Sequence, residues 1–306
     1  MFIWKTPKIN SINLGSFIDM DQSYKFTNFN IPIINLVKYL LIAASFTLAT
    51  EVFADVKQDV IDACADAINV DDFDSAFPNC TQAAEQGDPN AQFNVGLMYS
   101  NGEVTTTNDK QAIFWFTNAA KQGHVDAQYN LGVIYAGGNG SPKDDRKTVY
   151  WYTKAATQGH TKAQHDLGLM YAFGDGTPKN YQQALYWYTQ AAKLGNSSSQ
   201  FNLALIYANG NGVQKDYKQA RYWYSKAAYY GRANAQYNLG VIYAQGEGTP
   251  KDFVLAYTWF NIAAAQSDKN SIKARATIRT KMTSNQIVEA QELSKAISRF
   301  IINYQI

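Results

Sequence analysis

The segment Ala163–Ser198, AQHDLGLMYAFGDGTPKNYQQALYWYTQAAKLGNSS, decides the fold, because near copies of it recur every 36 residues in both directions. Five of the six tryptophans keep this period: Trp115, Trp151, Trp187, Trp223 and Trp259. The fuller copies start at Ala91, Ala127, Ala163, Ser199 and Ala235, so residues 91–270 are predicted to hold five repeats. A fixed period of about 20 to 50 residues is typical of repeat architectures.

Each copy divides into two predicted helices. Ala163, Leu167 and Tyr171 are spaced by four residues, which places them along one stripe of a first helix. Residues 181–192 space their aromatics and alanines by three or four, which predicts an amphipathic second helix with Asn180 as its cap. One helix pair cannot cover its own apolar faces, so neighbouring pairs must stack. We therefore predict an all-α fold, a right-handed α-solenoid of antiparallel helix pairs in 36-residue repeats.

The segment before the array carries an export pattern. Residues 1–36 show no sustained periodicity, and we expect a non-native or disordered N-terminal extension. In residues 37–54, Lys38 precedes an apolar run and small residues mark a cleavage site near Ala54, which is typical of a secretory signal peptide. A buried or interfacial helix is the alternative, and the run is too short for a stable membrane span. The mature chain is therefore expected in the periplasm or outside the cell.

Weaker patterns flank the array on both sides. Residues 55–90 form a partial copy that we interpret as an N-terminal cap, in which Pro78 is expected to kink any helix. Residues 271–306 are interpreted as C-terminal capping helices, with an apolar stripe that runs from Ile287 to Phe300.

Composition excludes two classes of protein. An apolar fraction of 46% and an aromatic fraction of 14% are too high for a disordered chain. Residues 55–306 carry 23 basic and 22 acidic side chains, so a broad electrostatic grip on nucleic acid is not expected.

The repeated pattern resembles the unit of the Sel-one-like repeat family, relatives of the tetratricopeptide repeats. That unit reads A-x-x-x-L-G-x-x-Y-x-x-G-x-G, then D-Y-x-x-A-x-x-W-Y-x-x-A-A-x-x-G, and residues 163–198 and 235–264 meet it almost fully. The resemblance implies a scaffold for protein–protein contacts that needs no cofactor.

By the same resemblance, the first helices would line a concave groove that binds another protein or a peptide. The positions implied are Phe93, Asn94, Tyr129, Asn130, His165, Asp166, Phe201, Asn202, Tyr237 and Asn238. Stacked amides can hydrogen-bond a peptide backbone, and aromatic rings supply contact area at low entropy cost. The alternative is that the asparagines join copies to one another and the aromatics belong to the core.

The cysteines and histidines are the residues most suited to special chemistry. An even cysteine count in an exported chain favours a disulfide between Cys64 and Cys80, with free buried thiols as the alternative. His124 and His160 occupy one slot in successive copies, but no further Cys or His ligand set accompanies them. We therefore expect solvated turn residues and no metal site.

Enzyme signatures are weak. The glycines in GDGTPKN follow no predicted strand and lack the P-loop pattern, and no serine is paired with a base. The leading prediction is a non-enzymatic, exported interaction scaffold. The alternatives are a secreted effector or virulence factor acting on a host protein and, from another class, a cell-wall or β-lactam hydrolase, which the resemblance to some cysteine-rich relatives suggests.

Overall fold

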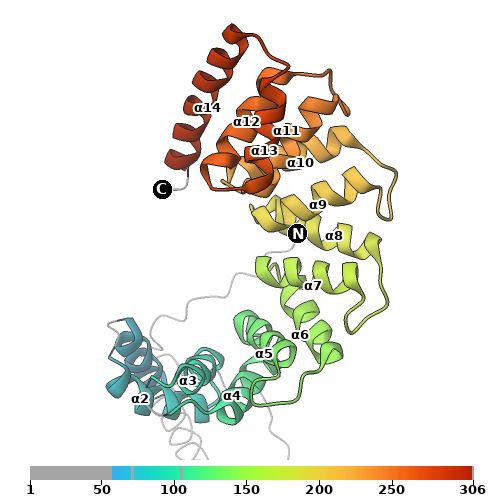
Figure 1. Ribbon diagram of the computed structural model, residues 1–306. Helices are drawn as coiled ribbons and strands as arrows, with labels where there is room; N and C mark the ends of the chain where they lie inside the picture. Colours follow the sequence, from blue (N-terminus) through green and yellow to red (C-terminus); the bar gives the residue numbers. More distant parts are fainter. Residues whose placement is uncertain (1–56, 70–71, 104–105, 305–306) are drawn as a thin grey trace, which may run out of the picture. The chain divides into compact units, whose positions relative to one another are not determined.

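The computed structural model describes residues 57–69, 72–103 and 106–304, and all regular structure within these ranges is helical (Figure 1). A helix over residues 57–69 is followed by α2 (Phe73–Glu85), α3 (Pro89–Asn101), α4 (Asp109–Lys121), α5 (Val125–Gly137), α6 (Asp145–Thr157), α7 (Thr161–Phe173), α8 (Tyr181–Lys193), α9 (Ser197–Asn209), α10 (Tyr217–Tyr229), α11 (Ala233–Gln245), α12 (Phe253–Ala265), α13 (Lys269–Arg279) and α14 (Ser284–Tyr304). The predicted extension at 1–36 and signal segment at 37–54 lie outside the described residues.

Consecutive helices pack against one another along the chain, which makes the array a solenoid (Figure 1). From α2 to α13, each helix contacts its neighbours in sequence. Five pairs, from α3 with α4 to α11 with α12, correspond to the five predicted copies. The predicted all-α repeat solenoid is confirmed.

Glycine in the first helix of a pair allows the second helix to approach closely. A Cβ added at Gly168 in α7 would lie 2.7 Å from the ring of Tyr188 in α8. Gly96, Gly132 and Gly240 face a ring in the same slot of their own pairs. In these four pairs the glycine allows the two helices to lie close together, whereas Ala204 occupies the slot in α9.

The helix ends are specified by residues between the halves. Gly174 ends α7 with φ 87°, a left-handed conformation that glycine adopts without steric cost. The N-cap of α8 is Asn180, whose Oδ1 accepts the backbone N–H groups of Gln182 and Gln183 at 3.0 and 3.1 Å. The predicted cap at Asn180 is confirmed.

A buried glutamine in each first helix joins neighbouring pairs. Gln128 in α5 donates from Nε2 to the carbonyl oxygen of Ala120 at 3.1 Å. Its Oε1 accepts Nε2–H of Gln158, the residue that ends α6, at 2.8 Å. Gln92 and Gln236 make the equivalent two hydrogen bonds.

We call this repeated set of two hydrogen bonds the glutamine ladder, and one repeat of it a rung; two of the five rungs are incomplete. Leu194 and Tyr230 occupy the positions that are equivalent to Gln158. Among the described residues, Oε1 of Gln164 and Oε1 of Gln200 are therefore buried without a hydrogen-bond partner. A buried acceptor left without a donor costs about 1 to 3 kcal/mol.

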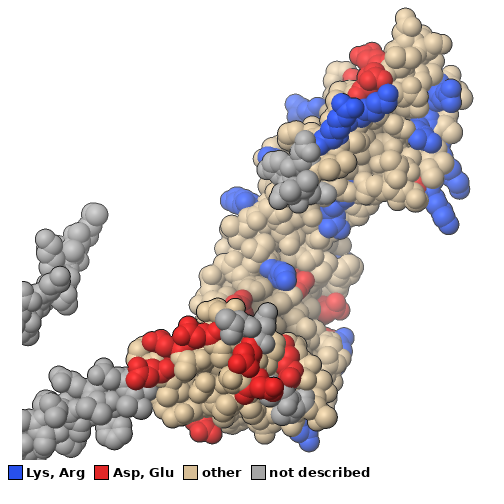
Figure 2. All heavy atoms as spheres, turned by 90° about the vertical axis from the view of Figure 1, so that its left-hand side faces the viewer, with Lys and Arg blue, Asp and Glu red and all other residues tan. Residues whose placement is uncertain are grey.

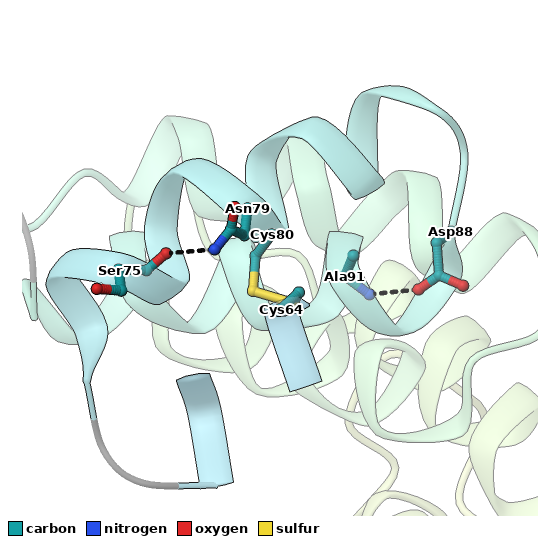
Figure 3. The surroundings of a disulfide bond; sticks show 6 residues. All are labelled: Cys64, Ser75, Asn79, Cys80, Asp88 and Ala91. Carbon is teal, nitrogen blue, oxygen red and sulfur yellow. Dashed lines mark hydrogen bonds between the residues drawn. A yellow bond between two sulfur atoms is a disulfide. The ribbon is translucent and has the colours of Figure 1, made fainter. Parts of the chain in front are cut away.

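A disulfide closes the N-terminal end of the array (Figure 3). Cys64 in the helix over 57–69 bonds to Cys80 in α2, and both are buried beside Val95 and Met98 of α3. The helix α2 continues through Pro78, the residue expected to kink it.

At the C-terminal end, α14 packs on α12. Thr258 donates from Oγ1 to the carbonyl oxygen of Ala290 at 3.2 Å, and Asn261 donates from Nδ2 to Oγ of Ser294 at 2.8 Å. Phe300, the last residue of the predicted stripe, is 54% exposed and meets the ring of Tyr229 edge-on with centroids 5.8 Å apart. Ile301 is buried and joins a cluster that includes residues of α10, α11 and α12.

We expect Leu194→Gln to stabilise the protein by about 1 kcal/mol, because the new amide supplies the donor that Oε1 of Gln164 lacks. Urea unfolding of the two proteins measures the difference. Leu194→Asn is the matched control, since it is polar but one methylene too short to reach. Equal stabilisation by both substitutions would contradict the ladder account.

Candidate binding surface

The ten positions implied for partner binding form what we call the first-helix row: Phe93, Asn94, Tyr129, Asn130, His165, Asp166, Phe201, Asn202, Tyr237 and Asn238. They occupy equivalent places in α3, α5, α7, α9 and α11, and all ten are half-buried. Each of these residues therefore makes contacts inside the protein and also has a surface exposed to solvent.

The rings of the row pack toward the interior. Tyr129 stacks on His160 with ring centroids 4.4 Å apart and lies 5.6 Å from Tyr152. Phe93 stacks on His124 at 4.5 Å in the same manner. The aromatic positions are thus anchored on the second helix of their pair and on the start of the next pair.

The polar positions link successive pairs. Hydrogen bonds join the side chains of Asn202 and Tyr188 and those of Asn238 and Tyr224. Burial raises the pKa of both tyrosines, so both phenols stay protonated. These two asparagines thus join successive copies, which is the role that the sequence offered as the alternative to partner binding.

The third rung differs because it carries Asp166 in place of asparagine. Oδ2 of Asp166 accepts O–H of Tyr129 at 3.2 Å. Burial raises the pKa of Asp166, and burial together with this carboxylate raises the pKa of Tyr129 to about 12. In the same rung, burial and the Arg232 guanidinium lower the pKa of His165 to about 4, and its Nδ1 lies 2.8 Å from Oγ of Ser199.

His124 and His160 are N-caps, which corrects the expectation of solvated turn residues. Nδ1 of His124 accepts the backbone N–H of Ala127 at 3.2 Å, and Nδ1 of His160 accepts that of Ala163 at 3.0 Å. Burial lowers the pKa of both imidazoles, which favours the neutral form that can accept. In the part of the chain that the structure describes, no group of three or more His, Cys, Asp or Glu could hold a metal ion.

A hollow of about 540 Å³ opens beside one rung of the first-helix row. It is lined by Asp126, Tyr129 and Asn130 of α5 and by Gly159, His160, Thr161 and Lys162 around the start of α7. A phenol ring, an amide, a carboxylate and an ammonium therefore meet at one open surface.

Charge is separated along the chain, although the total is nearly neutral. Residues 57–140 carry 11 acidic and three basic side chains, whereas residues 141–306 carry 10 acidic and 20 basic ones. Figure 2 shows Asp and Glu gathered over the N-terminal helices and Lys and Arg over the C-terminal ones. The net count near zero conceals this separation.

Sequence reasoning missed a second row of exposed rings. We call Phe114, Tyr150, Tyr186 and Tyr222 the second-helix row; they are 52%, 53%, 52% and 51% exposed. Each ring meets the next residue, a tryptophan, edge-on with centroids 4.9 to 5.0 Å apart. The signal was an aromatic residue directly before the tryptophan in four copies.

The Sel1 repeat model matches residues 89–124, 125–160, 161–196, 197–229 and 233–268. These matches cover more than half of the chain, so the protein belongs to the Sel1 repeat family. A search of curated proteins returns no match.

Two solved structures resemble the chain along most of its length. A Sel1 repeat protein from Oxalobacter formigenes is 32% identical, with a TM-score of 0.66, over 76% of this chain and 98% of that one. A protective antigen of uropathogenic Escherichia coli strains, displaying an SLR fold, is 33% identical, with a TM-score of 0.65, over 76% of this chain. This chain covers half of the antigen's length.

The histidine caps predict a pH-dependent stability. In the folded protein the pKa of each imidazole lies below its ordinary value of 6.5. The stability that the two caps contribute is therefore present above pH 6.5 and is lost as the pH falls and the imidazoles protonate. Asn196 caps α9 in the same slot without titrating. We expect His124→Asn with His160→Asn to reduce the loss of unfolding free energy between pH 7.5 and about 5 by roughly 1 kcal/mol per cap.

Urea titrations of the wild type and the double variant at both pH values measure this difference. Comparing each protein with itself removes the effect of the lost ring stacking. An identical pH dependence in the two proteins would show that the caps do not titrate with folding.

Proposed function

We propose that this protein is an exported, non-enzymatic scaffold that binds another protein or a peptide through the first-helix row. The observation that carries the proposal is the hollow beside Tyr129 and Asn130, where the row is open to a ligand. The other copies repeat an aromatic or imidazole ring every 36 residues, followed by an amide in every copy except that of Asp166. A row of this kind suits an extended chain that crosses several pairs.

The contacts of the row favour recognition by shape and hydrogen bonds. Rings anchored on neighbouring histidines, such as Tyr129 on His160, hold their exposed edges in place before binding. Anchored aromatic side chains lose little entropy when a partner binds. Charge steering has a smaller part, because the row itself contains one carboxylate and no lysine or arginine.

Export is supported by the Cys64–Cys80 disulfide, since such bonds persist in oxidising compartments. No helix among the described residues is long and apolar enough to cross a membrane. The proposal covers both a periplasmic and an extracellular location.

A second candidate is a secreted effector or virulence factor that acts on a host protein. The observation that favours it is the similarity to a protein whose structure is described as a protective antigen of uropathogenic strains. Recovery of the folded protein from culture supernatant supports this candidate, and retention in the periplasm supports the scaffold inside the envelope.

The test of the row is Tyr129→Ala combined with Asn130→Ala. Partners captured by crosslinking in the native cell are compared between this variant and the wild type. Removing a central anchor of an interface costs about 2 kcal/mol or more, so we expect recovery of the specific partner to fall by roughly thirtyfold.

Val288→Ala is the control, because Val288 is 59% exposed on α14 and outside the row. Circular dichroism verifies that each variant is folded. Undiminished partner recovery by the folded double variant would contradict binding through the first-helix row.

A further inference from the structure

Three hollows lie at equivalent places along the second helices. The first lies between α4 and α6, the next between α8 and α10, and the last between α12 and the turn that follows α10. Their shared positions are Gln128, Lys154 and Thr157 in the first, Gln200, Lys226 and Tyr229 in the second, and Gln236, Ile262 and Ala265 in the third. The repeat therefore builds the same groove several times.

The third groove already holds a helix. Ser298, Ile301 and Ile302 of α14 line it, and the space that remains is about 270 Å³. Ile301 is 7% exposed there. The two hydrogen bonds from α12, to Ala290 and then Ser294, advance in the same direction along both helices, so α14 runs parallel to α12.

The second groove, which we call the α8–α10 groove, is open and has a volume of about 770 Å³. Its walls are Lys193 of α8 and Tyr222, Trp223, Lys226 and Tyr229 of α10. A third wall is formed by Ala296, Ile297 and Phe300 of α14, and the Phe300 ring meets that of Tyr229 edge-on with centroids 5.8 Å apart. Tyr222 belongs to the second-helix row and is half exposed. An aromatic surface of this kind is uncommon where nothing binds.

The difference between the two grooves indicates what each accepts. Ile262 and Ala265 in the third groove are small or apolar and receive Ile301. Lys226 and Tyr229 replace them in the α8–α10 groove. A helix seated there needs apolar side chains for the rings and a negative charge for the lysines.

We propose that the α8–α10 groove binds an amphipathic helix of a partner protein that carries carboxylates beside its apolar stripe. The helix would lie on α10, between Lys193 of α8 and the wall formed by α14. This goes beyond the proposed function, because the groove is built from the second helices and shares no residue with the first-helix row. Both surfaces can therefore be occupied together.

Charge complementarity supports an acidic partner. Lys193 and Lys226 line the groove, and no carboxylate lines it among the described residues. The ammonium of Lys226 lies 5.8 Å from the ring centroid of Tyr222, so the charge is held beside the apolar surface. The groove also lies in the part of the chain with 20 basic and 10 acidic residues.

The incomplete glutamine rung is a second, independent observation. Gln200 lines the groove, is 3% exposed, and its Oε1 has no hydrogen-bond partner among the described residues. Oε1 of Gln164, one pair earlier, is also without a partner, whereas Oε1 of Gln128 and Oε1 of Gln236 each accept a hydrogen bond. A hydroxyl or amide donor on the partner helix would satisfy the acceptor.

Peptides based on α14 test the proposal, because α14 is the helix that the repeat accepts. Two labelled, helix-stabilised peptides of residues 284–302 are compared, one with Ser298→Glu and one with Ser298→Lys. Binding to the full chain is measured by fluorescence anisotropy at low and high salt. We expect the Ser298→Glu peptide to bind about tenfold more tightly at low salt, with the difference reduced at high salt.

Lys226→Glu in the protein should reverse this preference, whereas Lys273→Glu, an exposed lysine on α13, should leave it unchanged. Lys226 is exposed, so circular dichroism is expected to show an unaltered fold. Failure of both peptides to bind saturably, or a preference that Lys226→Glu does not alter, overturns the proposal. A dimer of the chain that Lys226→Glu dissociates in sedimentation also overturns it, because the occupant is then a second copy.

Discussion

The close contact between the glycine of a first helix and a ring of its second helix, made in four of the five pairs, is the constraint on which the array depends. In α9 the same slot holds Ala204. Gly168 against Tyr188 shows it most simply, because a Cβ would lie 2.7 Å from the ring. With the two helices this near, each pair buries alanines of its second helix and a leucine, or Val95 in the first pair, of its first helix. Each pair then offers the next a surface of constant shape, and neighbouring pairs stack in register.

Regular stacking gives the protein two repeated surfaces. The first-helix row presents ring edges and amides that are partly used to join successive pairs, as Asn202 with Tyr188 shows. The second-helix row presents half-exposed rings beside grooves, of which the last is filled by α14. The chain thus contains, in its own C-terminal helix, an example of what its grooves can hold.

The fold could be predicted from the sequence because a 36-residue period of alanine, leucine, glycine and tryptophan admits few arrangements. The interactions between copies could not be predicted from this period. The capping role of His160 depends on how α7 begins, and the missing partner of Gln200 depends on Tyr230 at the end of the same pair. Composition also concealed the charge separation, because opposite charges in the two parts cancel in the total.

The free energy of unfolding of Gly168→Ala tests the account most directly, because the two effects involved have opposite signs. Helix propensity alone favours alanine by about 1 kcal/mol. The account predicts a net loss of about 1 to 2 kcal/mol, because a Cβ 2.7 Å from the buried Tyr188 ring forces the ring or one of the two helices to shift. A gain in stability would contradict the claim that this contact fixes the spacing of the helices.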